Sequence, residues 1–171
     1  MSGESAVDTL DLALLTALRE NPRVGVLELS RLLHVARATV AARLQRLEQR
    51  GIVTGYGPDI DLAQAGFPVQ AFVTLEISQG ALDDVAADLA AVPGVLEAFA
   101  TTGSGDVLCK IAAASHSDLQ ATLVELTRAR SVTRSTSVIV LSTVIEPRAL
   151  PLLASRASAA GTRAPAFRAE D

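Results

Sequence analysis

The stretch from Glu28 to Gly51, ELSRLLHVARATVAARLQRLEQRG, constrains the fold of this chain more than any other part. It reads as two short helices around a four-residue turn. On the second helix Val40, Leu44 and Leu47 recur at i, i+4 and i+7, so they share one face that must be buried. Two short helices joined in this way are typical of a helix-turn-helix module.

The other faces of the second helix carry small, amide and cationic side chains. At 100° per residue Ala38, Ala42, Gln45 and Gln49 lie opposite the apolar face, flanked by Thr39, Arg43 and Arg46. Such a surface can lie close to a DNA major groove while its arginines reach phosphates or guanine edges. A helix whose arginines are merely solvated would show the same pattern, so this stretch alone leaves both interpretations open.

Composition predicts a globular protein of a reducing compartment. Apolar residues make up 49% of the 171 residues, which is enough for a core. Cys109 is the single cysteine, so no intramolecular disulfide is possible and a cytoplasmic location is expected. The N-terminus has no signal-peptide pattern, and no run approaches the ~18 apolar residues of a membrane span.

Charge is unevenly distributed along the chain. The formal net charge is −4, yet residues 28–50 contain five arginines against two glutamates. A small basic patch on an acidic protein is compatible with specific DNA binding and predicts modest affinity from one module, which favours an oligomer.

The periodicities predict an α+β chain with two domains. Asp8 and Asp11 can cap a first helix, and Ile52–Tyr56 reads as a short strand that starts a wing. After a linker the order of elements is βαββαβ, an antiparallel ferredoxin-like arrangement. Its strands are expected at residues 69–77, 95–101, 107–113 and 132–145, and its helices at 81–92 and 117–129.

The expected boundaries follow from these elements. They are a winged helix-turn-helix domain at 1–56, a linker at 57–67, a ferredoxin-like domain at 68–148, and a short helix fading into a disordered tail at 149–171. Two helices cover one sheet face, so Phe72 and Leu108 on the opposite face call for a partner.

This combination resembles the Lrp/AsnC (feast/famine) family of transcriptional regulators from Val7 to about Glu146. The residues that carry the resemblance are Asp8, Asp11, Leu14, Leu15, Arg23, Glu28, Leu29, Thr39, Val40, Arg43, Leu44, Arg46, Leu47, Glu48, Gly51, Gly55, Tyr56, Gly66, Pro93, Gly94, Val95, Thr102, Gly103, Asp106, Val132, Ile139, Val140 and Leu141. The resemblance implies binding to double-stranded DNA by the first domain. It also implies homodimers that assemble into octamers or similar, and a small-molecule effector, usually an amino acid, sensed by the second domain.

Carried over to this chain, the resemblance implies two sites. The DNA contacts would come from Arg37, Ala38, Thr39, Ala42, Arg43 and Arg46. Arg46 is the best candidate for a base-edge or phosphate contact, whereas Arg43 is balanced between a phosphate and an intramolecular acidic partner. Thr39 has local capping as its alternative.

The effector site would lie between dimers, near Thr102, Gly103, Ser104, Gly105 and Asp106. There glycine amides can form an anion nest for an α-carboxylate, and Asp106 can accept from an α-ammonium. A glycine-rich hairpin turn whose Asp caps the backbone is the alternative.

The chain departs from the family pattern in two places. The family usually has Gly-Leu-Ser before the recognition helix, where His34-Val35-Ala36 stands here, so the side-chain cap of the helix is lost. Aromatic residues often flank the effector-site Asp, where Gly105 and Val107 stand here. We therefore expect a changed operator sequence, and a less aromatic pocket whose ligand is unusual or absent.

Other classes of function fit less well. Siroheme decarboxylases resemble these regulators in architecture, but this chain has two histidines and no tryptophan, and no catalytic set, metal site or cofactor is expected. A ligand-binding or oligomerisation protein that has lost DNA binding stays open as the second alternative, because of His34 and Ala36.

Overall fold

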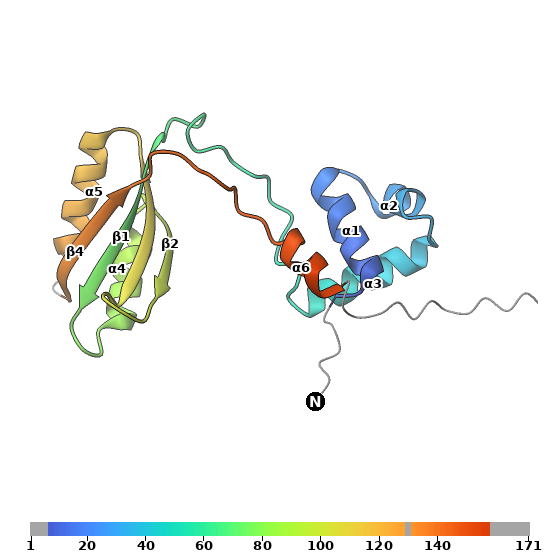
Figure 1. The fold of residues 1–171 in the computed structure, drawn as a ribbon, viewed down its shortest axis with the longest axis horizontal. Coiled ribbons are helices and arrows are strands. Elements are labelled where there is room, and N and C mark those ends of the chain that lie inside the picture. Colours follow the sequence, from blue (N-terminus) through green and yellow to red (C-terminus); the bar gives the residue numbers. More distant parts are fainter. Residues whose placement is uncertain (1–6, 129–130, 158–171) are drawn as a thin grey trace, which may run out of the picture. The chain divides into compact units, whose positions relative to one another are not determined.

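The computed structural model describes residues 7–128 and 131–157, which fall into two compact units. The N-terminal unit comprises the described residues of 1–58 and of 146–171, and the second unit spans residues 59–145. Figure 1 labels the helices and strands of both units, and each unit has its own hydrophobic core.

Three helices build the N-terminal unit, as the sequence predicts. They are α1 (Thr9–Glu20), α2 (Val26–Leu32) and α3 (Arg37–Gln49). Leu14 of α1, Leu29 of α2 and Leu47 of α3 are almost fully buried and meet in one core. Burial of three leucines contributes several kcal/mol, at roughly 1.5–3 kcal/mol for each side chain.

The segment after α3 differs from the expected strand. Gly51 has φ 65°, and its amide donates to the Glu48 carbonyl at 2.9 Å while the Ile52 amide donates to the Leu47 carbonyl at 2.9 Å. These two bonds form a Schellman cap, which ends α3 and uses the backbone donors that a strand would need. Residues 51–56 are therefore turn and irregular backbone, and the strand predicted at Ile52–Tyr56 is wrong.

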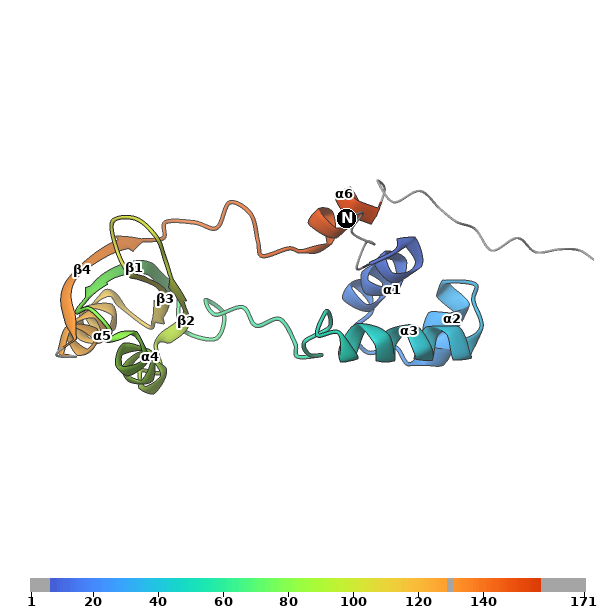
Figure 2. The ribbon, with the colours of Figure 1, turned by 90° about the horizontal axis from the view of Figure 1, so that it is seen from below.

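A further helix, α6 (Leu150–Ala157), joins the N-terminal unit from the far end of the sequence. It packs against α1, and in Figure 2 α3 runs along the other side of α1. Ala157 of α6 is buried, as is Val7 just before α1, although neither belongs to the central core of the unit. The short helix expected in the tail is thus present and packed, and residues 158–171, where disorder was expected, lie outside the described residues.

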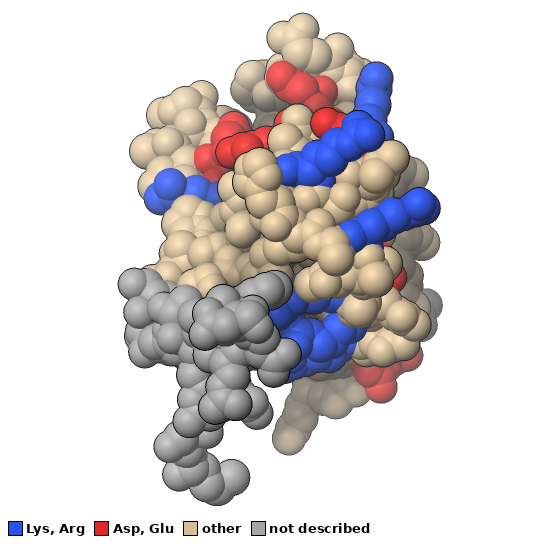
Figure 3. Space-filling model, turned by 90° about the vertical axis from the view of Figure 1, so that its right-hand side faces the viewer, with Lys and Arg blue, Asp and Glu red and all other residues tan. Residues whose placement is uncertain are grey.

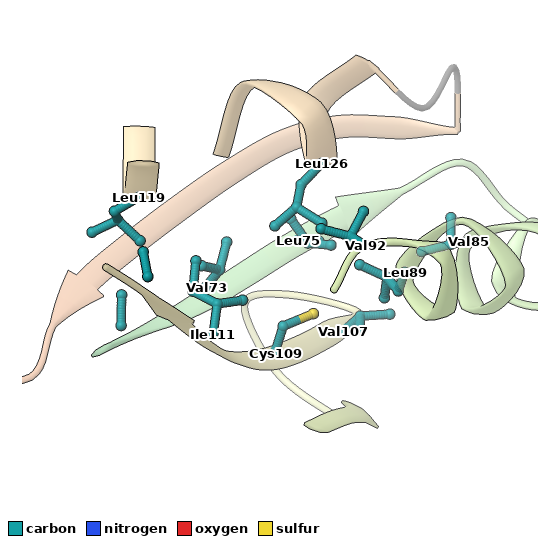
Figure 4. Close-up of a cluster of buried hydrophobic side chains, with 12 residues drawn as sticks. Val73, Leu75, Val85, Leu89, Val92, Val107, Cys109, Ile111, Leu119 and Leu126 are labelled. Atoms are coloured by element: carbon teal, nitrogen blue, oxygen red, sulfur yellow. The ribbon is translucent and has the colours of Figure 1, made fainter. Parts of the chain in front are cut away.

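The second unit is a four-stranded antiparallel sheet with strand order β2-β3-β1-β4, the predicted ferredoxin-like fold. Its elements are β1 (Val69–Ile77), α4 (Leu82–Ala91), β2 (Val95–Ala100), β3 (Val107–Ala113), α5 (His116–Arg128) and β4 (Val132–Ile139). Val73, Leu75 and Ile111 of the sheet pack with Leu89 of α4 and Leu126 of α5 (Figure 4).

Cys109 lies in this core, as the alternation of its strand predicts. Burial raises the pKa of its thiol to about 11. The thiol is therefore protonated at neutral pH and unavailable as a nucleophile.

No helix among the described residues of the unit covers the opposite face of the sheet. Phe72 pairs with Lys110 and Val138 across the strands, and Leu108 pairs with Phe99. Phe72, Phe99 and Val138 are exposed by 40%, 51% and 64%. We call Phe72, Phe99, Leu108 and Val138 the open-face cluster.

The final strand is shorter than predicted. Ile139 pairs with Ala71, and the Val140 amide still donates to the Gln70 carbonyl at 2.8 Å. Beyond this point the neighbouring chain reaches Pro68, which has no N–H to donate. β4 therefore ends at Ile139 instead of continuing to residue 145, and Leu141 is left 96% exposed.

Helix α6 should stabilise α1 through Ala157. We expect Ala157→Glu to place a charge at a buried site and to reduce the protection of the α1 amides against hydrogen exchange. Arg156→Glu is the matched control on the exposed side of the same helix and should change stability by less than about 0.5 kcal/mol. Equal protection of α1 in both variants would show that α6 does not support it.

Candidate functional site

Helix α3 presents a polar face to solvent because its apolar face is held in the core. Val40 and Leu47 are 1% and 0% exposed, and Leu44 packs partly buried against the same cluster. Ala38, Ala42, Gln45 and Gln49, on the opposite side, are all exposed. The predicted amphipathic arrangement of this helix is confirmed.

The N-terminus of α1 forms the capping box that its sequence predicts. The Asp8 carboxylate accepts from the Asp11 amide at 2.8 Å, and the Asp11 carboxylate accepts from the Asp8 amide at 3.2 Å. Each acid thereby satisfies a backbone donor at the positive end of the helix dipole.

The same two carboxylates also bind the arginines of α3. Arg43 donates through Nη1 to Asp8 Oδ2 at 2.5 Å and to Asp11 Oδ1 at 2.8 Å. Arg46 donates through Nη2 to Asp11 Oδ2, and this nitrogen lies 4.0 Å from Asp8 Oδ2. We call Asp8, Asp11, Arg43 and Arg46 the α1–α3 ion cluster.

Burial makes the ion cluster more than a surface salt bridge. The Asp11 side chain is 0% exposed, while those of Arg43 and Arg46 are 26% and 46% exposed. Burial works against ionisation of Asp8, but the Arg43 hydrogen bond, the Asp11 amide and the charges of both arginines together lower the pKa of Asp8. The hydrogen bond to Asp8 likewise raises the pKa of Arg43. Asp8 and Arg43 are thus both charged at neutral pH.

This cluster changes the roles expected for the two arginines. Arg43 has the intramolecular acidic partners that were one of its two expected roles. Arg46, the first candidate for a DNA contact, is also tied to Asp11. The sequence carried a signal for this pairing, because Asp8 and Asp11 have the same three-residue spacing as Arg43 and Arg46.

Four polar side chains of α3 remain without partners among the described residues. Arg37 and Thr39 stand at its first turn, and Gln45 and Gln49 lie on its outer face, all of them exposed. The Thr39 hydroxyl makes no local cap within the described part of the chain. In Figure 3, basic side chains on the visible face are separated by uncharged and acidic surface.

The turn before α3 has unusual backbone geometry. His34 has φ 53°, the left-handed region that glycine occupies most easily, and Ala36 at the N-cap makes no side-chain hydrogen bond to the helix. His34 and Ala36, which replace the glycine and serine of the family pattern, therefore stand at positions where those two residues would have a physical role.

The loop expected to bind an effector is tied to strand β1. The Asp106 carboxylate accepts from the Ile77 amide at 2.8 Å, and the Asp106 amide donates to the Leu75 carbonyl at 2.9 Å. Thr101 closes the turn by donating from its hydroxyl to the Gly105 carbonyl at 2.9 Å. One oxygen of Asp106 thus caps the backbone, which was the alternative to ligand binding.

Gly105 fits closely against the sheet. A Cβ atom at this position would lie 2.1 Å from Cγ2 of Thr74. With Thr74 in this position, the aromatic residue that the family often has at residue 105 would clash with the sheet. Gly103, with φ 122°, is the loop position whose backbone conformation favours glycine.

The described residues contain neither a candidate metal site nor a candidate membrane-spanning helix. Within 7–128 and 131–157 there is no group of three His, Cys, Asp or Glu side chains that could hold a metal ion. No helix in these ranges is both long and apolar enough to cross a membrane.

Loss of Asp11 should weaken the N-terminal unit. Asp11→Ala removes the carboxylate that both arginines share, and we expect it to lower the free energy of unfolding by about 2–4 kcal/mol, since both guanidiniums keep some solvent contact. The control is Glu28→Ala, which breaks the exposed pair with Arg31 at 3.3 Å and should cost below about 1 kcal/mol. Urea unfolding followed by circular dichroism measures both, and equal losses would contradict the role of the cluster.

Substitutions in the turn before α3 should raise the free energy of unfolding instead of lowering it. Ala36→Ser supplies the missing N-cap and should stabilise the N-terminal unit by about 0.5–2 kcal/mol. His34→Gly removes a strained left-handed side chain and should also be stabilising. Ala41→Ser, on the exposed middle of the same helix, is the control and should not stabilise. Unchanged or lower unfolding midpoints in the first two variants would count against this account.

Comparison with known proteins agrees with this architecture. The family model described as a winged helix-turn-helix DNA-binding domain matches residues 7–54, and the Lrp/AsnC ligand binding domain matches residues 70–150. Regulatory protein AsnC of Escherichia coli is 30% identical over 137 residues, 79% of this chain and 90% of that protein. The HTH-type transcriptional regulator FL11 of Pyrococcus horikoshii is 26% identical over 85% of this chain and 97% of its own length.

Two solved structures have the same fold. The structure of E. coli AsnC has a TM-score of 0.79 and 28% identity, covering 85% of this chain and 99% of that one. A Neisseria meningitidis transcriptional regulator in complex with L-methionine has a TM-score of 0.78 and 29% identity, covering 85% and 97%. With both of its units matched in order along one chain, the protein belongs to the Lrp/AsnC family of helix-turn-helix transcriptional regulators.

Proposed function

We propose that this regulator acts in the cytoplasm by placing α3 of two copies in successive major grooves of promoter DNA. The observation that carries the proposal is the exposed face of α3, on which Ala38 and Ala42 are small and Gln45 and Gln49 have no partner among the described residues, opposite the buried Val40 and Leu47. A helix of this shape can enter a groove about 12 Å wide without a steric block from large side chains.

The DNA contacts are assigned unequally along α3. Arg37 and Thr39 at its first turn have no partners among the described residues and lie at the end of α3 that recognition helices bring to DNA. We assign them phosphate contacts, with close approach to the groove by Ala38 and Ala42. Arg43 serves to hold α3. Arg46 keeps guanidinium donors beyond the one given to Asp11, and these can reach a phosphate without leaving the cluster.

Dimers form through the open face of the sheet in this proposal. The open-face cluster places two phenylalanines and two aliphatic side chains on a face that no described helix covers. Packing this face against the same face of a second copy removes apolar area from water and gives the sheet a second packed layer. Further assembly into octamers or similar particles would present several copies of α3.

The effector is an amino acid or a similar metabolite held near residues 102–106. L-Methionine complexes of the Neisseria regulator and of a Mycobacterium tuberculosis feast or famine regulatory protein, 27% identical, support this choice. In the loop, Thr102, Gly103 and Ser104 are exposed and can offer backbone amides to a carboxylate, and the second oxygen of Asp106 can accept from an ammonium. The ligand would shift assembly, and thus promoter occupancy, through unequal affinity for the two states.

A titration against the upstream intergenic DNA of the chain's own gene tests the DNA-binding part. We expect preferential binding over a scrambled duplex, with Arg37→Ala weakening binding to both and lowering the salt dependence by about one phosphate contact. Arg128→Ala is the control, because this arginine is exposed at the end of α5 in the second unit. It should change neither the affinity for DNA nor its salt dependence.

The same titration repeated with each of the 20 amino acids tests the effector. At least one should change the affinity or the oligomer distribution, measured by analytical ultracentrifugation. No response to any amino acid would remove the effector proposal in this form. No binding to either duplex at low salt by a folded oligomer would instead favour the alternative that DNA binding has been lost.

A further inference from the structure

One line of side chains along α3 faces directly away from the core. Ala38, Ala42, Gln45 and Gln49 follow one another at i, i+4, i+7 and i+11, which keeps them within about 60° of arc. All four are exposed, and they lie opposite Val40 and Leu47. We call these four residues the outer row.

The arginines next to the outer row cannot serve as its base readers. Arg43 and Arg46 are turned toward the N-terminus of α1, where the buried Asp11 carboxylate accepts from both. Swinging either guanidinium out to a guanine edge would leave a fully buried carboxylate with one cation fewer, at a considerable cost in free energy. The ion cluster therefore withdraws from base reading the two cations that lie beside the row.

Gln45 is then the first residue of the outer row with a hydrogen-bonding group that can identify a base. Ala38 and Ala42 precede it and have only methyl groups, which permit close approach to the groove floor and fit against a thymine methyl. The Gln45 amide has no hydrogen-bond partner among the residues that the structure describes, so no internal bond must break before it meets DNA. An amide offers a donor and an acceptor side by side, the pattern that matches adenine N6 and N7.

We propose that Gln45 reads an adenine in the major groove and is the main base-specifying side chain of α3. This inference rests on the proposed DNA binding by α3 and names the residue that gives it sequence preference. The i, i+4, i+7 spacing of Ala38, Ala42 and Gln45 is also the spacing of base-contacting positions on homeodomain recognition helices. Gln49 lies one turn further toward the C-terminal end of α3 and leaves the groove floor, because a straight helix diverges from a curved groove.

Selection from a random duplex library with the full-length protein tests the assignment. The wild type should enrich an adenine at one fixed position in each half-site. Gln45→Ala should lose the preference at that position alone and bind the selected site about 5- to 150-fold more weakly. Gln45→Arg should change the preferred base at the same position to guanine, because arginine pairs with guanine O6 and N7.

Gln49→Ala is the matched control, since it removes the same amide from the same row one turn away. It should return the wild-type site with little change in affinity. An unchanged base preference in both Gln45 variants would overturn the assignment, as would loss of the adenine in the Gln49 variant. A wild type that binds DNA but enriches no base at any position also overturns it, whereas a wild type that binds no duplex overturns the proposed function as well.

Discussion

The ion cluster between α1 and α3 is the interaction on which the orientation of α3, the helix proposed to face DNA, depends. Two carboxylates that cap α1 also receive two guanidiniums from α3, and one of these carboxylates has no solvent exposure. Because arginine donors have a fixed planar geometry, the pairing sets the roll of α3 about its own axis as well as its distance from α1. The hydrophobic core would tolerate small changes in that roll, and the buried charges do not.

Stability and specificity are therefore linked in the N-terminal unit. Arg43 and Arg46, which the sequence pattern places beside the DNA-binding face, are paired with Asp11 and hold α3. In the proposed binding mode this leaves a neutral outer row toward the groove, so base contacts and the number of bound copies would contribute a larger share of the affinity than free cations. The acidic net charge of −4 agrees with a regulator that relies on several modules and not on a large basic surface.

In the second unit, polar groups of the loop proposed to bind the effector are likewise used to fix that loop to the sheet. Asp106 caps the end of the β1–β3 pairing, and Gly105 makes room for Thr74, so the loop at residues 101–106 is fixed to the sheet before any ligand arrives. The two units are joined by two chain segments, because the chain leaves the N-terminal unit near residue 58 and returns to it near residue 146, where it leads into α6.

The sequence by itself determined the elements and the layers of the fold. The 3.6-residue and two-residue periods of apolar side chains predict α1 to α3 and the βαββαβ order, since such periods record which side of each element is buried. It overestimated the strands at Ile52–Tyr56 and at residues 140–145, whose composition favours a strand although, beyond the Val140 amide bond to Gln70, no strand among the described residues pairs with them. Local propensity carries no information about partners.

Only the tertiary structure decided which polar groups are free. The sequence placed Arg43 and Arg46 beside the outer row, but whether they face DNA or Asp11 depends on how α1 crosses α3, a distance of more than 30 residues along the chain. The docking of α6 on α1, nearly the whole chain apart, was likewise outside the reach of local pattern. Long-range pairings are set by packing geometry, and for this protein they determine which side chains can read DNA.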